Sequence, residues 1–271
     1  MQIASIGGVE LAYRTAGDDG DAPVMLIHGY TGNLRNWGAT VPALLRAGFR
    51  TLSADNPGHG ASGAPKRFEP YALDEVARTL HGLAEGLDFH PAVLVGHSMG
   101  GAIAEEYALQ FPEAVRALVL VGSAGGASGP EREDLSDDMQ ALRAACERGG
   151  MEAVFDLQLE HGKRPAAAAA DPDRQALLRT EFARTSFEGF EFGALALRTR
   201  RDTLPRLANL RIPTLILRGE HEDPTLVRVS DDLAATIPGA RLAVLPGAGH
   251  SPQFEAPEAF NRVLLEFLGT L

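Results

Sequence analysis

A regular alternation of short apolar segments with helical stretches restricts the possible folds most strongly. From the third segment onward, the segments are apolar on both faces, as in a parallel sheet covered by helices on each side. Only Gly7-Gly8 separates the first two segments, which predicts an antiparallel hairpin. The sequence therefore predicts an α/β fold with a mostly parallel, eight-stranded sheet, with strands over residues 1–6, 9–16, 24–27, 49–54, 92–95, 117–121, 214–217 and 241–245.

One long interval interrupts this alternation. Residues 126–209, between the sixth strand and the seventh, carry no strand signal and are too many for a single crossover helix. A chain of 271 residues suits one large α/β domain. We expect residues 1–125 and 210–271 to form this core, and residues 126–209 to form a helical cap (lid) inserted into it.

Local signals within the cap predict two helices. Ser128-Gly129-Pro130-Glu131 resembles a capping box, and apolar residues at helical spacing follow it: Leu135, Met139, Leu142 and Cys146. Asp171-Pro172 predicts a second helix start, with Asp as the N-cap residue. The run Ala166 to Ala170 fits either a helix or a connector.

Composition excludes several classes of protein. A net charge of −11 with scattered Lys and Arg argues against binding nucleic acid or an anionic membrane. We find no signal peptide pattern and no apolar segment long enough to span a bilayer. The single cysteine, Cys146, excludes an intrachain disulfide and a cysteine metal cluster, so we expect a cytoplasmic protein. The sequence does not indicate an oligomeric state.

A serine motif follows the fifth predicted strand. Reactive groups in open parallel sheets gather at the carboxyl ends of the strands. Residues 96–100, Gly-His-Ser-Met-Gly, lie between that strand and a predicted helix, which is the context of a nucleophile elbow. Small neighbours permit a sharp turn that projects the serine hydroxyl beside the positive end of the helix. Ser98 is therefore our candidate nucleophile.

A serine hydroxyl needs a base within hydrogen-bond reach and an acid that orients the base. His250 lies in a Gly-rich loop after the last strand and takes the last place in the chain order Ser, acid, His. The acid should follow the seventh strand, where three acidic residues lie: Glu220, Glu222 and Asp223. We interpret six other histidines as structural: His28, His59, His81, His90, His97 and His161.

The elbow, the His28-Gly29 turn and the strand-end loops together resemble the α/β-hydrolase family. That resemblance places the acid three residues after the glycine that ends the seventh strand, which selects Glu222 where the family more often has Asp. A shift of one residue would select Asp223 instead, and we prefer Glu222. The resemblance also implies an oxyanion hole formed by the backbone N–H groups of Tyr30 and Met99.

A serine at the elbow separates this chain from haloalkane dehalogenases and epoxide hydrolases of the same fold, which use Asp there. We expect a hydrolase that cleaves small-molecule carboxylic esters through an acyl-enzyme on Ser98, with His250 as base. The alternatives are a C–C bond hydrolase, a lyase or synthase resembling those of menaquinone synthesis, and a non-enzymatic ligand receptor. No cofactor and no metal are implied, because no histidine or cysteine cluster has ligand spacing.

Aromatic residues gather in the second half of the cap. One interpretation is that they line an apolar acyl pocket, with Phe187 and Phe190 as candidate substrate contacts, which would favour a medium-chain or aromatic ester. The other interpretation is that these side chains pack the cap onto the core, and we expect this of at least half of them. The residues concerned are Phe182, Phe187, Phe190, Phe192, Leu195 and Leu197.

Overall fold

An eight-stranded sheet forms the centre of the structure, a computed structural model that describes residues 1–126, 139–161 and 172–271. The strand order is β1-β2-β4-β3-β5-β6-β7-β8, and the predicted fold class is confirmed. The bounds are β1 Gln2–Ile6, β2 Val9–Ala16, β3 Ala22–Ile27, β4 Phe49–Ala54, β5 Ala92–His97, β6 Val115–Val121, β7 Thr214–Gly219 and β8 Arg241–Leu245. β3, β5, β6 and β7 are each two residues longer than predicted, and β1 is one residue shorter.

The hairpin of β1 and β2 begins the sheet. Gly7 and Gly8 have φ angles of 58° and 84°, which suits the tight two-residue turn that pairs Ile6 with Val9. β2 also pairs antiparallel with β4, whereas the remaining neighbours from β4 to β8 are parallel. The carboxyl ends of these parallel strands therefore meet at one edge of the sheet.

Helices cover both faces of the sheet. On one face α1 and α11 enclose a core with Trp37 and Phe260, whose ring centroids lie 6.4 Å apart. On the other face α2, α3 and α9 pack against the sheet. The bounds of these helices and the short ones are η1 Leu34–Trp37, α1 Thr40–Arg46, η2 Glu69–Tyr71, α2 Leu73–Gly86, α3 Met99–Gln110, η3 Pro112–Ala114, α9 Pro224–Thr236, α10 Pro252–Glu255 and α11 Pro257–Leu268.

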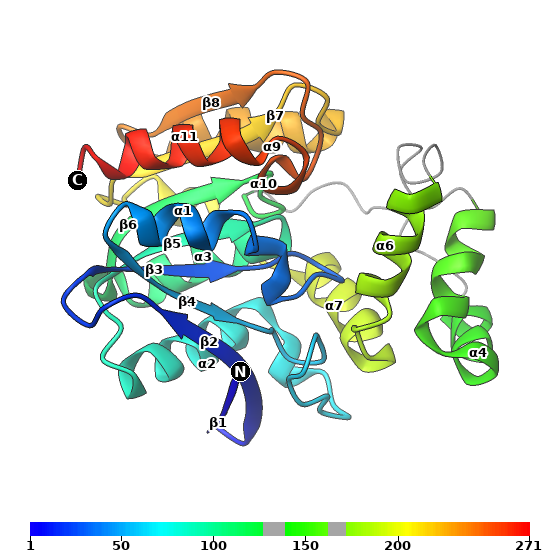
Figure 1. The fold of residues 1–271 in the computed structure, drawn as a ribbon. Helices are drawn as coiled ribbons and strands as arrows, with labels where there is room; N and C mark the ends of the chain where they lie inside the picture. Colours follow the sequence, from blue (N-terminus) through cyan, green and yellow to red (C-terminus); the bar gives the residue numbers. More distant parts are fainter. Residues whose placement is uncertain (127–138, 162–171) are drawn as a thin grey trace.

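The described residues between β6 and β7 form four further helices, and Figure 1 shows α4, α6 and α7 beyond one end of the sheet. They are α4 Met139–Glu160, α6 Pro172–Phe182, α7 Phe187–Thr199 and α8 Leu204–Leu207. Their apolar side chains form a separate core that includes Phe155 and Phe182. We propose that residues 126–209, which contain these helices, act as a cap over the carboxyl ends of the strands.

Some details of the predicted cap helices can be compared with the structure. Met139, Leu142 and Cys146 lie on α4. Their side chains pack in the apolar core of the inserted helices, which agrees with their helical spacing. The predicted capping box, Leu135, the alanine run and Asp171 lie outside the described residues. Over the described ranges, no helix is long and apolar enough to cross a membrane.

A buried carboxylate joins the two ends of the inserted segment. Glu105 on α3 is fully buried and accepts a hydrogen bond from Ser123 Oγ at 2.8 Å. It also accepts from Gly126 N at 2.8 Å and from Thr203 Oγ1 at 2.7 Å. Burial raises the pKa of Glu105, while these three donors act to lower it. The carboxylate thus fixes the points where the chain leaves the core and returns to it.

Replacing Glu105 by glutamine should lower the free energy of unfolding by about 1–3 kcal/mol, because an amide cannot accept from all three donors and leaves one of them buried and unsatisfied. Glu106→Gln is the matched control, since Glu106 contacts the half-exposed Arg206 at 3.3 Å and should lose less. Urea unfolding measures both. Equal losses of unfolding free energy in the two variants would contradict a larger contribution of the Glu105 hydrogen bonds to stability.

Candidate active site

The turn between β5 and α3 holds Ser98 in an unusual backbone conformation. Ser98 has φ 53° and ψ −116°, in a region that non-glycine residues rarely adopt. Its neighbours must be small: a Cβ on Gly96 would lie 2.2 Å from Gly100 O, and one on Gly100 would lie 2.2 Å from Ile27 O. These close approaches explain the two glycines of the motif and expose the hydroxyl at the strand end.

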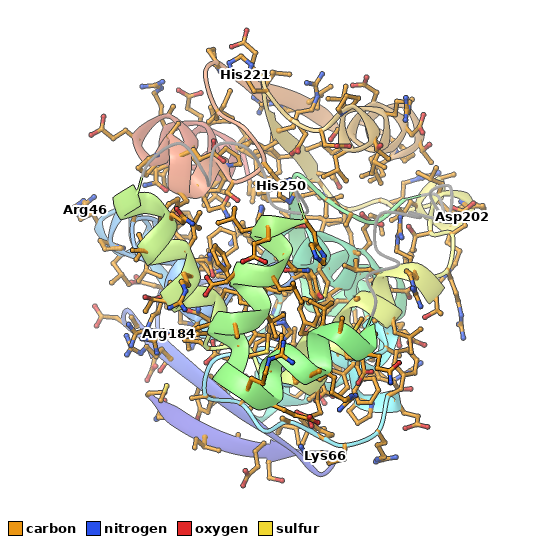
Figure 2. The ribbon with its side chains drawn as sticks, turned by 90° about the vertical axis from the view of Figure 1, so that its right-hand side faces the viewer. Arg46, Lys66, Arg184, Asp202, His221 and His250 are labelled. Atoms are coloured by element: carbon orange, nitrogen blue, oxygen red, sulfur yellow. The ribbon has the colours of Figure 1, made fainter. Side chains whose placement is uncertain are left out.

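Three side chains from separate loops form a continuous chain of contacts. His250 Nε2 lies 3.0 Å from Ser98 Oγ, and His250 Nδ1 lies 3.0 Å from each carboxylate oxygen of Glu222. Because an ionised carboxylate only accepts, Nδ1 carries the proton and Nε2 can accept the serine proton. Figure 2, seen from the side of the inserted helices, places His250 near the middle of the molecule.

The loop after β7 gives its three acidic residues different partners. The Glu222 side chain is fully buried against His250 and also accepts from Asp223 N at 2.9 Å. Asp223 is the N-cap residue of α9 and accepts from Thr225 N at 2.8 Å. Glu220 accepts from Gly247 N. The structure therefore brings Glu222 rather than Asp223 to His250, which favours Glu222, and the role of either residue as the acid stays a prediction.

The two candidate oxyanion donors flank Ser98. A Cβ on Gly29 would lie 3.0 Å from Ser98 Cβ, so the turn that carries Tyr30 packs directly on the serine. Met99 is the first residue of α3, where a backbone N–H has no acceptor within the helix. The Tyr30 side chain points elsewhere, since its hydroxyl donates to Phe190 O at 2.8 Å. Both N–H groups remain proposed donors.

Two buried histidines hold the loops after β3 and β4 together. His28 Nε2 accepts from Asn56 N at 2.9 Å, and its Nδ1 donates to Gly29 O. His59 Nε2 accepts from Thr31 N at 3.3 Å, and its Nδ1 donates to Pro57 O. Each ring has one accepting nitrogen, so each must be neutral. Burial lowers the pKa of His28 to about 4 and that of His59 to about 3.

We expect the lowered pKa of His28 to make stability depend on pH. The folded pKa lies below the unfolded value near 6.5, so the unfolded state binds more protons as the pH falls. This contribution to stability is full above about pH 6.5 and is lost toward pH 4. The amide oxygen of His28→Gln can still accept a hydrogen bond from Asn56 N, but the amide does not titrate. This variant should therefore reduce the slope of unfolding free energy against pH by up to about 1.4 kcal/mol per pH unit. Urea unfolding of both proteins between pH 5 and 7.5 measures this difference, and parallel slopes would contradict it.

The aromatic residues offered as substrate contacts lie inside the core of the inserted helices. Phe187 and Phe190 are only 8% and 2% exposed and pack with Phe155 and Phe182. Phe190 also stacks on the Tyr30 ring, with centroids 5.8 Å apart. The packing interpretation therefore accounts for both side chains, and their contact with a substrate stays a prediction.

Sequence reasoning gave no role in the site to two residues that contact the candidate triad of Ser98, His250 and Glu222, and none in anchoring the inserted segment to Glu105. Gly122 has φ 48°, and a Cβ there would lie 2.8 Å from Glu222 Oε2. His97 donates to the backbone of His250, and Glu105 anchors the inserted segment. Only the position of His97 inside the serine motif could have drawn attention to it. Within the described part of the chain, no three His, Cys, Asp or Glu side chains form a group suited to a metal ion.

The fold and this arrangement define an α/β hydrolase. The model of the alpha/beta hydrolase fold family matches residues 22–257, and the chain belongs to this family.

Similar proteins are named for different reactions. The 2-hydroxy-6-oxononadienedioate/2-hydroxy-6-oxononatrienedioate hydrolase of Paraburkholderia xenovorans is 30% identical over 97% of this chain and 91% of its own. A Bacillus subtilis protein, provisionally named as a 2-succinyl-6-hydroxy-2,4-cyclohexadiene-1-carboxylate synthase, is 26% identical over 100% of this chain and 99% of its own. The structure of a thermophilic esterase from Thermogutta terrifontis superposes with a TM-score of 0.84, at 26% identity over 100% of this chain and 99% of that one.

Proposed function

We propose that this protein hydrolyses carboxylic esters through an acyl-enzyme on Ser98. The observation that carries the proposal is the position of His250, 3.0 Å from Ser98 Oγ on one side and from both Glu222 oxygens on the other. This arrangement provides a nucleophile, a base and an acid that orients the base. The similarity to an esterase of closely matching fold supports the choice of ester over other carbonyl substrates.

The proposed reaction follows from the positions of these groups. His250 Nε2 takes the hydroxyl proton as Ser98 Oγ attacks the ester carbonyl, and the resulting oxyanion accepts from the N–H groups of Tyr30 and Met99. His250 then returns the proton to the leaving alcohol as the C–O bond breaks. A water molecule, deprotonated by His250, attacks the acyl-enzyme and releases the acid. Glu222 stays ionised and stabilises the imidazolium in each half of the reaction.

Hydrolysis of p-nitrophenyl esters from acetate to long acyl chains tests the proposal. We expect turnover of at least part of the series, and the preferred chain length measures how much acyl chain the site accommodates. Absence of turnover across the whole series would overturn ester hydrolysis as the function.

A C–C bond hydrolase is the second candidate, because a relative with that kind of substrate is 30% identical over nearly the whole chain. The same three side chains can serve C–C hydrolysis, so the geometry alone does not separate the two reactions. A vinylogous diketone of the meta-cleavage type, assayed beside the esters, separates them. Faster turnover of the diketone than of every ester would favour this candidate.

A further inference from the structure

His97, the residue before Ser98, lies between the two loops that complete the candidate site. Its Nε2 is 2.9 Å from the backbone oxygen of His250, and the two rings have centroids 4.9 Å apart. On its other side, a Cβ on Gly29 would lie 3.0 Å from His97 Nδ1, so the turn before Tyr30 packs on the ring. One buried ring thus contacts both the loop of the base and the turn of the proposed oxyanion donor.

The contact with His250 fixes the protonation of His97. A backbone oxygen only accepts, so Nε2 must carry a proton and donate it. Burial, aided by the neighbouring His250 and His28, lowers the pKa of His97 to about 3. The ring therefore stays neutral, and it does not compete with His250 for the serine proton.

The elements around His97 give this hydrogen bond a clear mechanical role. His97 is the last residue of β5, whose register with β6 is fixed by backbone pairing. His250 instead lies in a loop, five residues beyond the end of β8 at Leu245. The hydrogen bond connects this loop to the rigid strand that also carries Ser98.

We propose that His97 is a positioning residue that holds the backbone of His250 so that its Nε2 meets Ser98 Oγ. The inference rests on the proposed roles of Ser98 and His250, and it adds a group that does not touch the substrate. A displacement of about 1 Å in a reacting group can cost about 100-fold in rate. Losing the donor at residue 97 should therefore lower the reactivity of Ser98 without changing substrate affinity.

A pair of matched variants isolates the donor. Glutamine places an amide N–H the same number of bonds from Cβ as His97 Nε2, whereas methionine has similar length and no donor. Reaction with a fluorophosphonate probe measures Ser98 directly: Oγ bonds to phosphorus, fluoride leaves, and His250 takes the proton. We expect His97→Met to react about 100-fold more slowly than wild type, and His97→Gln to recover most of the rate. On any ester that wild type hydrolyses, kcat should fall in His97→Met while KM changes little.

Three results would overturn the proposal: equal losses in the two variants, no loss in either, or a loss that appears only in KM. Circular dichroism melting of both variants checks that they fold. If only His97→Gln folds, a rate near that of wild type supports the donor at residue 97, and a rate as low as about 100-fold below wild type overturns it. Failure of ester hydrolysis as the function is separate, since it would appear as wild-type protein that reacts with the probe and hydrolyses no ester.

Discussion

Replacing Ser98 by alanine should lower kcat for ester hydrolysis by up to about a million-fold, the loss measured when the nucleophile of a serine triad is removed. No other described side chain takes the place of its hydroxyl beside His250 Nε2. Alanine removes only the hydroxyl and keeps Cβ, so the variant should fold as wild type does. Steady-state hydrolysis of the best p-nitrophenyl ester measures the effect.

Ser5→Ala is a suitable control, because Ser5 is exposed on β1 at the opposite edge of the sheet from β8. It should keep full activity. Hydrolysis that persists in Ser98→Ala would place the reaction at another group, and the proposed acyl-enzyme would have to be abandoned.

The second large effect concerns the acid. Glu222→Gln should lower kcat by about ten-thousand-fold, because an amide can donate to His250 Nδ1 and so favour the tautomer that cannot accept the serine proton. Asp223→Asn is the matched control on the neighbouring residue. Asparagine caps helices as well as aspartate does, so this variant should keep the N-terminus of α9 and most of the activity.

Kinetics of the two variants side by side, with thermal melting to check folding, decide between the acids. A larger loss in Asp223→Asn than in Glu222→Gln would mean that the loop rearranges during the reaction. In that case the contact seen between Glu222 and His250 would belong to a resting state.

The sheet could be predicted from the sequence because each strand carries its own local signal. Short runs such as residues 92–95 are apolar on both faces, and the glycines at 7 and 8 specify a hairpin. The strand ends were harder to predict, since pairing in the sheet extends β5 to His97 and β7 to Gly219. Their last residues have little apolar character, and only neighbouring strands make them extended.

The candidate site was predicted in part for a related reason. Ser98 lies in a local motif, and the strand-end loops of a parallel sheet must converge, so His250 and the acidic run could be named. The choice between Glu222 and Asp223 depends on the path of one loop, which sequence spacing leaves open. The contacts of Glu105, His97 and Gly122 join residues that are far apart in the chain. A periodic pattern in the sequence does not predict contacts of this kind.

The hydrogen bonds at Glu105 have a consequence for how this protein can vary. The backbone N–H of Thr203 donates a hydrogen bond to Gly126 O at 3.2 Å, so the chain leaves the core and returns to it at almost one point. An insertion whose ends meet in this way is a replaceable module, because exchanging it does not require the sheet to move. We expect the core to accept segments of different length between these two residues wherever contacts such as those of Ser186 with Gly58 and of Phe190 with Tyr30 are replaced.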